Sequence, residues 1–440
     1  MRTVLVMGAG RVSAPCIDYL TRRGGCRVVV SDVSQGGLDS VARLFPSVVT
    51  DRQDAGGEGA AQLTDRYSPD VVISLLPHEF MPAIAKVCLD KGTHMVNPAY
   101  MAPAISALSP EVASKGLVFV TELGVDPGID HMSAAKNISM IHERGGLVES
   151  FRSLCGALPA PEANDNPWGY KLSWAPSSLI GASRRTAKIL DDGHEILWPD
   201  GETYEHVSMI DVPGIASLEV YANADSTVYK SDYGIPEANS IYRGTLRYPG
   251  WCETICHMNA IGFFDDKKQD AKGMTFAHFT ARQAGGGGDP KEALCRKLGL
   301  KPWSAFILRM EWIGFFDDRP LPSESLSARD VVSYLFAEKL TISPDERDMI
   351  VLFDEITARY PDGTRRIHRS VLTDFGTPGK WTSIARTTGV PPAIAAKFIM
   401  DGKIITPGIH KPTLREIYGP VLEELAAEGI ELKESQIDIL

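Results

Sequence analysis

The segment "ELGVDPGIDHM", Glu122 to Met132, gathers three acidic side chains and a histidine shortly after an apolar run. Carboxylates and imidazoles are the side chains that most often accept and release protons in catalysis. Gly124, Pro127 and Gly128 are residue types that allow a tight turn. The segment therefore predicts a turn that presents proton-transfer groups at the end of a buried strand.

The polar side chains of this segment also have a structural alternative. Asp126 or Asp130 could cap the helix that follows the turn, because aspartate is a preferred N-terminal capping residue. We expect Asp126 to belong to a catalytic site. We expect His131 to be a structural part of the helix and not a base.

A second motif, "MGAGRVSAP", follows the first apolar strand and opens a helix. Gly8 permits the sharp turn, and Gly10 lets the backbone approach a pyrophosphate at the helix N-terminus. Ser13 replaces the third glycine of the G-x-G-x-x-G pattern and is small enough for close helix–strand packing. The motif predicts a dinucleotide site. Its predicted cofactor-binding residues are Gly8, Gly10, Arg11, Val12, Asp32, Leu76 and Pro77.

Asp32 ends the second apolar strand, "VVVSD". An acid at this point accepts hydrogen bonds from the 2′-hydroxyl of the adenosine ribose and repels a 2′-phosphate. The alternative is an aspartate that only caps the next helix. We predict NAD as the preferred cofactor, with NADP as the alternative.

Apolar strands and helical segments, which would position these groups, alternate regularly in the first 124 residues. Apolar strands without polar alternation are buried on both faces, which requires helices on both sides of a parallel sheet. Ligands of such sheets lie beyond the carboxyl ends of the strands, and the acidic segment follows the sixth strand. The six runs are "TVLVMG", "CRVVVSD", "SVVTD", "VVISLLP", "THMVNPAY" and "LVFVTELG".

After residue 150 strands no longer alternate strictly with helices, which favours an α+β domain with an open antiparallel sheet. Strands are expected at "SLEVYA", "STVYKS" and "IYRGTLRYP", and a hairpin is expected around "PDGT". Helices dominate between about residues 281 and 348. The hexapeptide "IGFFDD" occurs twice, at 261–266 and 313–318, and we interpret it as two similar helix-ending turns without a longer repeat.

Composition excludes several functional classes. A net charge of −11 argues against a general nucleic-acid or membrane-surface partner. No apolar run approaches the ~20 residues of a spanning helix, and Met1 leads directly into the first strand. Seven scattered cysteines fit a reducing cytoplasm. "CETICH" lacks a zinc-site pattern, so we predict no metal.

Two further features suggest recognition of a substrate. "CGALPAPEANDNPWGYKLSW" (155–174) is a long polar loop, which is costly to order unless it shapes a binding surface. Arg243 and Arg247 stand on one strand at a spacing that puts both on the same face, where guanidinium groups can bind carboxylates. The alternative for the loop is an exposed surface segment without a binding role. The alternative for the two arginines is an exposed ladder of ion pairs.

Together with "ELGVDPGIDHM" and "YRGTLRY", this loop resembles the saccharopine dehydrogenase family in its glutamate-forming branch, over nearly the whole chain. The resemblance implies oxidation of a secondary amine by a nicotinamide cofactor, and hydrolysis of the imine to glutamate and 2-aminoadipate 6-semialdehyde. It also implies a homodimer. Its proton-handling and water-positioning residues fall on Tyr100, Asp126 and Cys155, with no single general base fixed. Its substrate-binding positions are Ala99, Tyr100, Val125, Asp126, Thr245, Leu246 and Arg247.

The domain organisation expected from these patterns has three parts. They are a doubly wound Rossmann-type α/β domain over 1–130, with 386–440 packing back on it; an α+β domain with an open mixed or antiparallel sheet over 131–280 and 350–385; and a small helical insertion over 281–349.

Two departures put the exact substrate in question. The family's "NRDS" is "NADS" here, with Ala224 in place of arginine, and Ala99 stands where many members carry serine. Losing a buried carboxylate contact costs on the order of 2–5 kcal/mol unless another cation substitutes. The alternative functions are a related amine dehydrogenase, such as a lysine 6-dehydrogenase or carboxyspermidine-type reductase, and a non-catalytic NAD-binding regulator.

Overall fold

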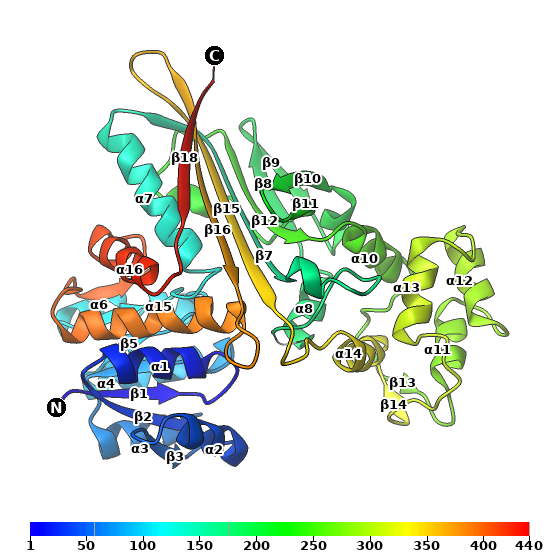
Figure 1. Cartoon of the computed structure of the whole chain (residues 1–440), viewed down its shortest axis with the longest axis horizontal. Coiled ribbons are helices and arrows are strands. Elements are labelled where there is room, and N and C mark those ends of the chain that lie inside the picture. Colours follow the sequence, from blue (N-terminus) through cyan, green and yellow to red (C-terminus); the bar gives the residue numbers. More distant parts are fainter. Residues whose placement is uncertain (57, 175, 440) are drawn as a thin grey trace. The chain divides into compact units, whose positions relative to one another are not determined.

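The computed structural model describes residues 1–56, 58–174 and 176–439 (Figure 1). Packing divides the chain into two compact units. The first unit comprises Met1–Glu149, Ser231–Glu237 and Leu352–Leu440, and the second comprises Ser150–Lys230 and Ala238–Val351. Packing alone defines these units, and the domain boundaries expected from the sequence stay a prediction.

The first unit contains a seven-stranded parallel sheet with the order β17-β6-β5-β4-β1-β2-β3. Every residue of β1 and β4 is buried, which is why their sequences are apolar on both faces. The predicted doubly wound parallel sheet is confirmed. The strands are β1 (Thr3–Met7), β2 (Arg27–Asp32), β3 (Val49–Arg52), β4 (Val71–Ser74), β5 (His94–Val96), β6 (Val118–Val120) and β17 (Gly408–His410).

Helices cover this sheet. Leu5, Met7 and Val72 share an apolar cluster with the inward side chains of two helices, such as Leu63 and Ile84. The helices that connect the strands are α1 (Ser13–Arg23), α2 (Gln35–Leu44), α3 (Glu58–Tyr67), η1 (His78–Phe80), α4 (Met81–Lys91), α5 (Pro103–Ser106) and α6 (Ser109–Ser114).

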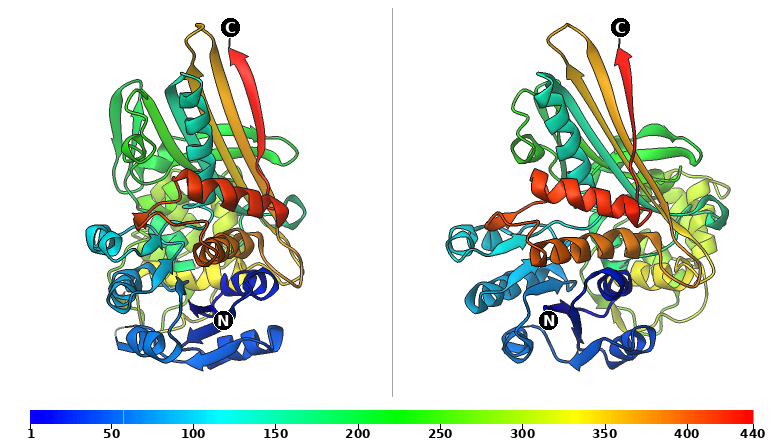
Figure 2. Two further views of the ribbon diagram at one scale, coloured as in Figure 1. Left: turned by 90° about the vertical axis from the view of Figure 1, so that its left-hand side faces the viewer. Right: turned by 60° about the vertical axis from the view of Figure 1, so that its left-hand side comes forward.

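The C-terminal part of the chain returns to this sheet and adds its last strand, β17, beside β6. Helix α15 (Ser383–Met400) packs along α1, as Figure 2 shows. The approach is close at Gly389, where a Cβ atom would lie 2.2 Å from the carbonyl oxygen of Val12. A larger residue at position 389 would therefore push α15 away from the turn that leads into α1.

The first unit also holds α7 (Ile129–Glu143), which contacts α16 (Arg415–Ala427). The predicted hairpin is confirmed by β15 (Asp348–Arg359) and β16 (Arg365–Phe375), whose turn is closed by a hydrogen bond from Tyr360 N–H to the Thr364 carbonyl. Strand β18 (Lys433–Ile439) pairs antiparallel with β16. Strands β7 (Leu147–Pro159) and β15 each run through a boundary between the units.

The second unit builds a mixed sheet. Strand β12 pairs parallel with β7 and antiparallel with β11 and β8, while β10 pairs with β11 and β9 with β8. The predicted open mixed sheet is confirmed. The remaining elements here are η2 (Pro161–Ala163), α8 (Pro176–Ala182), β8 (Ala187–Asp191), β9 (His194–Trp198), η3 (Glu202–Glu205), β10 (Ser208–Val212), β11 (Ala216–Ala222) and β12 (Ser240–Arg247).

The strand predicted at "STVYKS" is wrong. This segment is a turn that leads into the short helix α9 (Tyr229–Asp232). The Asp225 carboxylate accepts hydrogen bonds from both the backbone N–H and the hydroxyl of Thr227. Such a local side-chain hydrogen bond offers the backbone an alternative to a strand ladder.

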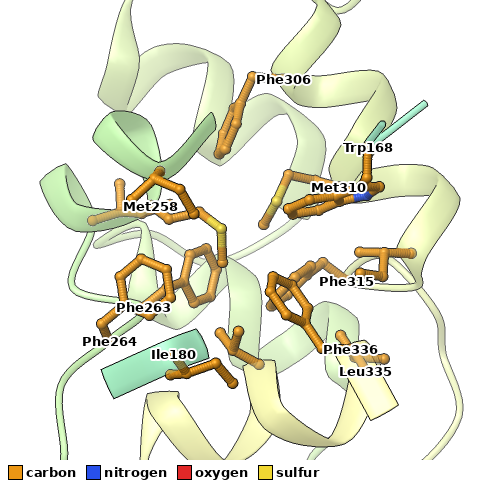
Figure 3. Close-up of a cluster of buried hydrophobic side chains, with 14 of the residues drawn as sticks. Trp168, Ile180, Met258, Phe263, Phe264, Phe306, Met310, Phe315, Leu335 and Phe336 are labelled. Atoms are coloured by element: carbon orange, nitrogen blue, oxygen red, sulfur yellow. The ribbon is translucent and has the colours of Figure 1, made fainter. Parts of the chain in front are cut away.

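A helical part of the second unit surrounds an aromatic and aliphatic cluster (Figure 3). Its helices are α10 (Trp251–Ala260), α11 (Phe276–Gln283), α12 (Pro290–Leu298), α13 (Ala305–Ile313) and α14 (Ala328–Lys339), and its short strands β13 (Gln269–Asp270) and β14 (Ser325–Leu326) pair antiparallel.

The two "IGFFDD" segments end α10 and α13 with similar turns. Gly262 and Gly314 both have positive φ, and the rings of Phe263 and Phe315 lie 4.7 Å apart within the cluster of Figure 3. The interpretation as helix-ending turns is confirmed. The similarity nevertheless extends further than expected, because each turn is followed by a member of the β13–β14 pair and a helix with a hydroxyl N-cap.

No helix among the described residues is long and apolar enough to cross a membrane.

Candidate active site

The glycine turn after β1 has the geometry expected for a dinucleotide site. Gly8 has φ +113°, a conformation that favours glycine, and its N–H donates to the Ser31 carbonyl at 2.8 Å. Ser13 lies at the start of α1 and donates its hydroxyl to the Gly10 carbonyl at 2.7 Å. A Cβ atom at Gly10 would meet no atom within 4 Å, so the backbone there borders open space that a pyrophosphate needs.

Asp32 is tied to this turn. Its Oδ2 accepts the N–H of Ala9 and its Oδ1 accepts the N–H of Ser34, each at 2.7 Å. Ser34, and not Asp32, caps α2, because the Ser34 hydroxyl accepts the N–H of Gly37. The capping alternative for Asp32 is therefore wrong.

The ends of the neighbouring strands also suit a polar ligand. Ser74 ends β4, and Asn97 and Thr121 directly follow β5 and β6. Within the described residues, the Ser74 hydroxyl, the Asn97 amide nitrogen and the Thr121 hydroxyl are buried without a hydrogen-bond partner. Leu76 and Pro77, the other predicted cofactor contacts, follow β4 at the same edge. The residues present thus fit a dinucleotide cofactor.

The acidic segment after β6 forms the expected tight turn. Gly124 N–H donates to the Pro127 carbonyl at 2.8 Å, and a Cβ atom at Gly128 would lie 2.1 Å from the Gly124 carbonyl oxygen. Asp130 stabilises the turn, because its Oδ1 accepts the N–H groups of Gly128 and His131. Asp130 therefore has a structural role in the turn, although the N-cap of α7 is Gly128 and not an aspartate.

Asp126 instead meets Tyr100, which follows β5. The Tyr100 hydroxyl donates to Asp126 Oδ1 at 3.2 Å, and the tyrosine side chain is about half exposed. The two neighbouring residues of the predicted substrate set, Ala99 and Val125, flank this pair in sequence. The strand ends of the first unit therefore bring together two of the three residues predicted to handle protons.

The third, Cys155, lies in the second unit. It stands opposite Thr245 in the parallel pairing of β7 with β12, so their side chains share a face of the sheet. Tyr221 stands opposite Thr245 on the other side, in β11. Leu246 points to the opposite face and is fully buried.

Arg247, on the same face of β12 as Thr245, is 4% exposed. Its guanidinium lies over the rings of Tyr170 and Trp251 and donates one hydrogen bond, from Nη1 to the Leu246 carbonyl. Its Nε has no partner, and no carboxylate of the described residues pairs with it. Burial raises the pKa of Tyr170 and Tyr221, so these phenols are neutral and do not balance the charge.

Comparisons with known proteins identify the family of this chain. Residues 4–120 match a model described as the saccharopine dehydrogenase NADP binding domain, and residues 124–430 match the saccharopine dehydrogenase C-terminal domain. The chain belongs to the saccharopine dehydrogenase family. The family predicted from the sequence motifs is confirmed.

Individual relatives extend over the whole chain. The Schizosaccharomyces pombe protein named saccharopine dehydrogenase [NADP(+), L-glutamate-forming] is 32% identical, with all of both chains covered. A solved apo saccharopine dehydrogenase (L-Glu forming) from Saccharomyces cerevisiae is 33% identical, covers 99% of this chain and 100% of its own, and superposes with a TM-score of 0.91. The bovine mitochondrial alpha-aminoadipic semialdehyde synthase is 34% identical to this chain. The matched region covers 98% of this chain but only 47% of the bovine protein.

A more distant structure, a homospermidine synthase from Legionella pneumophila, shares the fold alone, with 9% identity and a TM-score of 0.59. The family and its oxidoreductase names establish a nicotinamide cofactor. These names specify NADP, and they do not support the NAD preference predicted from Asp32.

Lys171 and Arg243 are cations that could substitute for the arginine replaced by Ala224, but both already have partners. Lys171 already pairs with Asp165 and Glu346, and Arg243 is buried against Tyr229, with its guanidinium 4.7 Å from the ring centroid. Arg243 and Arg247 of β12 are both buried, so the alternative that they form an exposed ladder of ion pairs is wrong.

The sequence interpretation missed Arg185. Its Nη1 donates to the side chain of Asn223 at 3.0 Å, directly beside Ala224. No local motif marks Arg185, because the contact joins two loops that are distant in sequence.

A buried cluster in the first unit was also missed. Glu122 Oε2 lies 2.8 Å from His131 Nε2, and the other ring nitrogen of His131 lies 2.8 Å from the Tyr233 hydroxyl. The expected structural role of His131 agrees with its position inside α7. Burial favours the neutral acid, but His131, Lys411 and the Met101 N–H outweigh this effect and hold the pKa of Glu122 below its usual range.

Proposed function

We propose that this chain oxidises the CH–NH bond of saccharopine with a nicotinamide cofactor and releases L-glutamate and 2-aminoadipate 6-semialdehyde. Arg247 is the observation that carries this proposal. A guanidinium buried without a counter-ion is costly to the fold, and a bound carboxylate would remove that cost through charge-assisted hydrogen bonds. Saccharopine carries three carboxylates.

The proposed roles of the other residues follow from the chemistry. Gly8, Gly10 and Asp32 would hold the cofactor, which when bound would supply the hydride acceptor for the carbon that becomes the aldehyde. The amine must be neutral for its lone pair to form the C=N bond, so a protein group accepts its proton. The Tyr100–Asp126 pair is suited to this step, since the carboxylate accepts the phenol hydrogen bond.

Hydrolysis completes the reaction. Water adds to the imine carbon, and the carbinolamine then breaks its C–N bond, with one proton delivered to the nitrogen that leaves as the amine of glutamate. We assign Cys155 and Thr245 to the orientation of substrate or water, because they share one face of the second unit's sheet. Arg247 docks a carboxylate that does not change during the reaction.

A spectrophotometric screen tests the proposal. The full chain is incubated with NAD or NADP and with saccharopine, lysine or a carboxylated polyamine, and reduced cofactor is followed at 340 nm. Turnover of saccharopine with equimolar glutamate supports the proposal. Turnover only of lysine or the polyamine would assign the chain to another amine dehydrogenase, and cofactor binding without any turnover would favour a regulator.

For the cofactor we propose NAD over NADP, in contrast to the names of the fungal relatives. Asp32 supports this choice because its carboxylate, fixed by the Ala9 and Ser34 N–H groups, would face a 2′-phosphate with like charge. We expect kcat/KM for NAD to exceed that for NADP about tenfold or more, and Asp32→Ser to narrow the gap. Equal or better use of NADP by the wild type would refute this choice. The homodimer and the cytoplasmic location stay predictions.

A further inference from the structure

The backbone on both sides of Tyr100 is held by one buried residue, through its main chain on one side and its side chain on the other. The N–H of Glu122 donates to the carbonyl of Ala99 at 3.0 Å, and Glu122 Oε1 accepts the N–H of Met101 at 2.9 Å. The two hydrogen bonds bracket Tyr100, whose own side chain is about half exposed. Glu122 thus fixes the segment that carries the phenol.

The cost of this arrangement indicates a role beyond stability. Glu122 has φ +56°, a backbone conformation that is strained for a residue with a side chain and that occurs preferentially at functional sites. It is also 2% exposed. A carboxylate is expensive to bury unless it is paired and hydrogen-bonded.

Neighbouring groups supply that compensation. His131 Nε2 lies 2.8 Å from Oε2, and Lys411 Nζ lies 3.4 Å from Oε1. The Tyr233 hydroxyl contacts the Nδ1 atom of His131, and the Asp232 carboxylate accepts a hydrogen bond from Lys411. Tyr233 and Asp232 are neighbours in one short segment. The cluster therefore holds Glu122 as a carboxylate acceptor in a defined position.

Asp126 lies on the turn that directly follows Glu122. The first half of that turn leaves β6 through Glu122, and its second half begins α7, which carries His131. The Glu122–His131 contact thus ties the two ends of the turn together while Oε1 holds Met101. Both members of the Tyr100–Asp126 hydrogen bond depend on this one cluster.

We propose that Glu122 is a positioning residue, which keeps the Tyr100 phenol beside Asp126 by holding the backbone of residues 99 and 101. The inference rests on the proposed function only for the choice of the assayed amine. If saccharopine is not turned over, the comparison is made with whichever amine the screen identifies, so the two proposals fail separately.

The first test is Glu122→Ala, which removes the acceptor for the Met101 N–H. We expect kcat to fall at least tenfold, the Kd for the cofactor to stay within twofold, and amide exchange to accelerate in residues 97–102. Glu122→Gln keeps an acceptor of the same length, so it should retain at least a third of wild-type kcat. If Glu122→Ala does not fold, Glu122→Gly replaces it, because glycine adopts φ +56° without strain.

Glu237→Ala is a matched control in the same unit. Glu237 also pairs with a histidine, His142, at 2.9 Å, and also accepts a backbone N–H, that of Val148, at 3.1 Å. These contacts lie at the other end of α7, more than ten residues from His131. Glu237→Ala should lower Tm without changing kcat more than twofold.

A double-mutant cycle separates positioning from general damage. In a Tyr100→Phe background the phenol hydroxyl is absent, so Glu122→Ala should change kcat less than twofold. An equal loss of kcat in both backgrounds would overturn the proposal. So would a Glu122→Ala enzyme that keeps kcat within threefold of the wild type.

Discussion

Glu122 in the first unit and Arg247 in the second are both almost completely buried and both carry a charge, yet their surroundings differ. Glu122 is paired with His131 and Lys411 and accepts a backbone N–H. Arg247 has two aromatic faces, one carbonyl and no carboxylate among the described residues. A buried charge that is paired fixes its neighbours in place, whereas at a buried charge without a counter-ion we expect a ligand of the opposite sign to bind.

The largest expected effect comes from removing the uncompensated charge. Arg247→Met should raise KM for saccharopine about 100-fold, equivalent to about 2.7 kcal/mol, because it deletes carboxylate docking. It should leave Tm unchanged or raised, since replacing a buried charge by an apolar side chain is often stabilising. Steady-state kinetics and calorimetry measure the two quantities.

Arg309→Met is the matched control for this prediction. Arg309 is a largely buried arginine of the same unit, but it is bound by the Pro167 carbonyl, the Thr254 hydroxyl and Glu253. The Arg309→Met variant should have a lower Tm than the wild type and an unchanged KM for saccharopine. A drop in Tm for Arg247→Met as large as that of Arg309→Met would make Arg247 a structural residue like Arg309.

The next effect concerns the residue that the Glu122 cluster helps to place. Asp126→Asn should lower kcat at least tenfold and leave cofactor affinity nearly unchanged, because we propose that the cofactor binds at the glycine turn. Asp130→Asn is its control, since an amide oxygen can still accept the N–H groups of Gly128 and His131. Full turnover of Asp126→Asn at every pH would remove Asp126 from the chemistry.

Acid unfolding tests the compensated charge. The pKa of Glu122 is lowered in the fold from an ordinary value of 4.5, so its carboxylate contributes stability above about pH 4.5 and loses that contribution as pH falls through the folded pKa. At pH 7, Glu122→Gln should therefore have a Tm on the order of 5 °C below the wild type. The difference should shrink below pH 4.5, and a constant difference across pH would contradict the paired carboxylate.

The smallest effect is expected at Ala224, where the family motif has arginine. If Arg247 and other cations, among them Arg185, suffice for the substrate carboxylates, Ala224→Arg should change kcat/KM for saccharopine less than tenfold, about 1.4 kcal/mol. A larger gain would show that the uncompensated charge at Arg247 does not meet the needs of a substrate with three carboxylates.

Local patterns in the sequence account for much of the first unit. The strands from β1 to β6 follow from runs of apolar residues, and the Gly8 turn follows from its motif. That Tyr100 and Asp126 meet is also predictable, because carboxyl ends of neighbouring parallel strands share one edge. The strand expected at "STVYKS" is wrong because Asp225 turns the backbone through hydrogen bonds to Thr227 that a propensity pattern does not reveal.

The sequence alone therefore determined the type of most elements, the family and the groups available for chemistry. Tertiary structure decided which of those groups are compensated. Lys411 reaches Glu122 because β17 returns to the sheet beside β6 and brings the following residues to that edge. Among the described residues no carboxylate pairs with Arg247, because Tyr170, which is distant in sequence, and Trp251, four residues further along the chain, fill the space around its guanidinium. Charge compensation depends on contacts between segments far apart along the chain, and for that reason no local pattern encodes it.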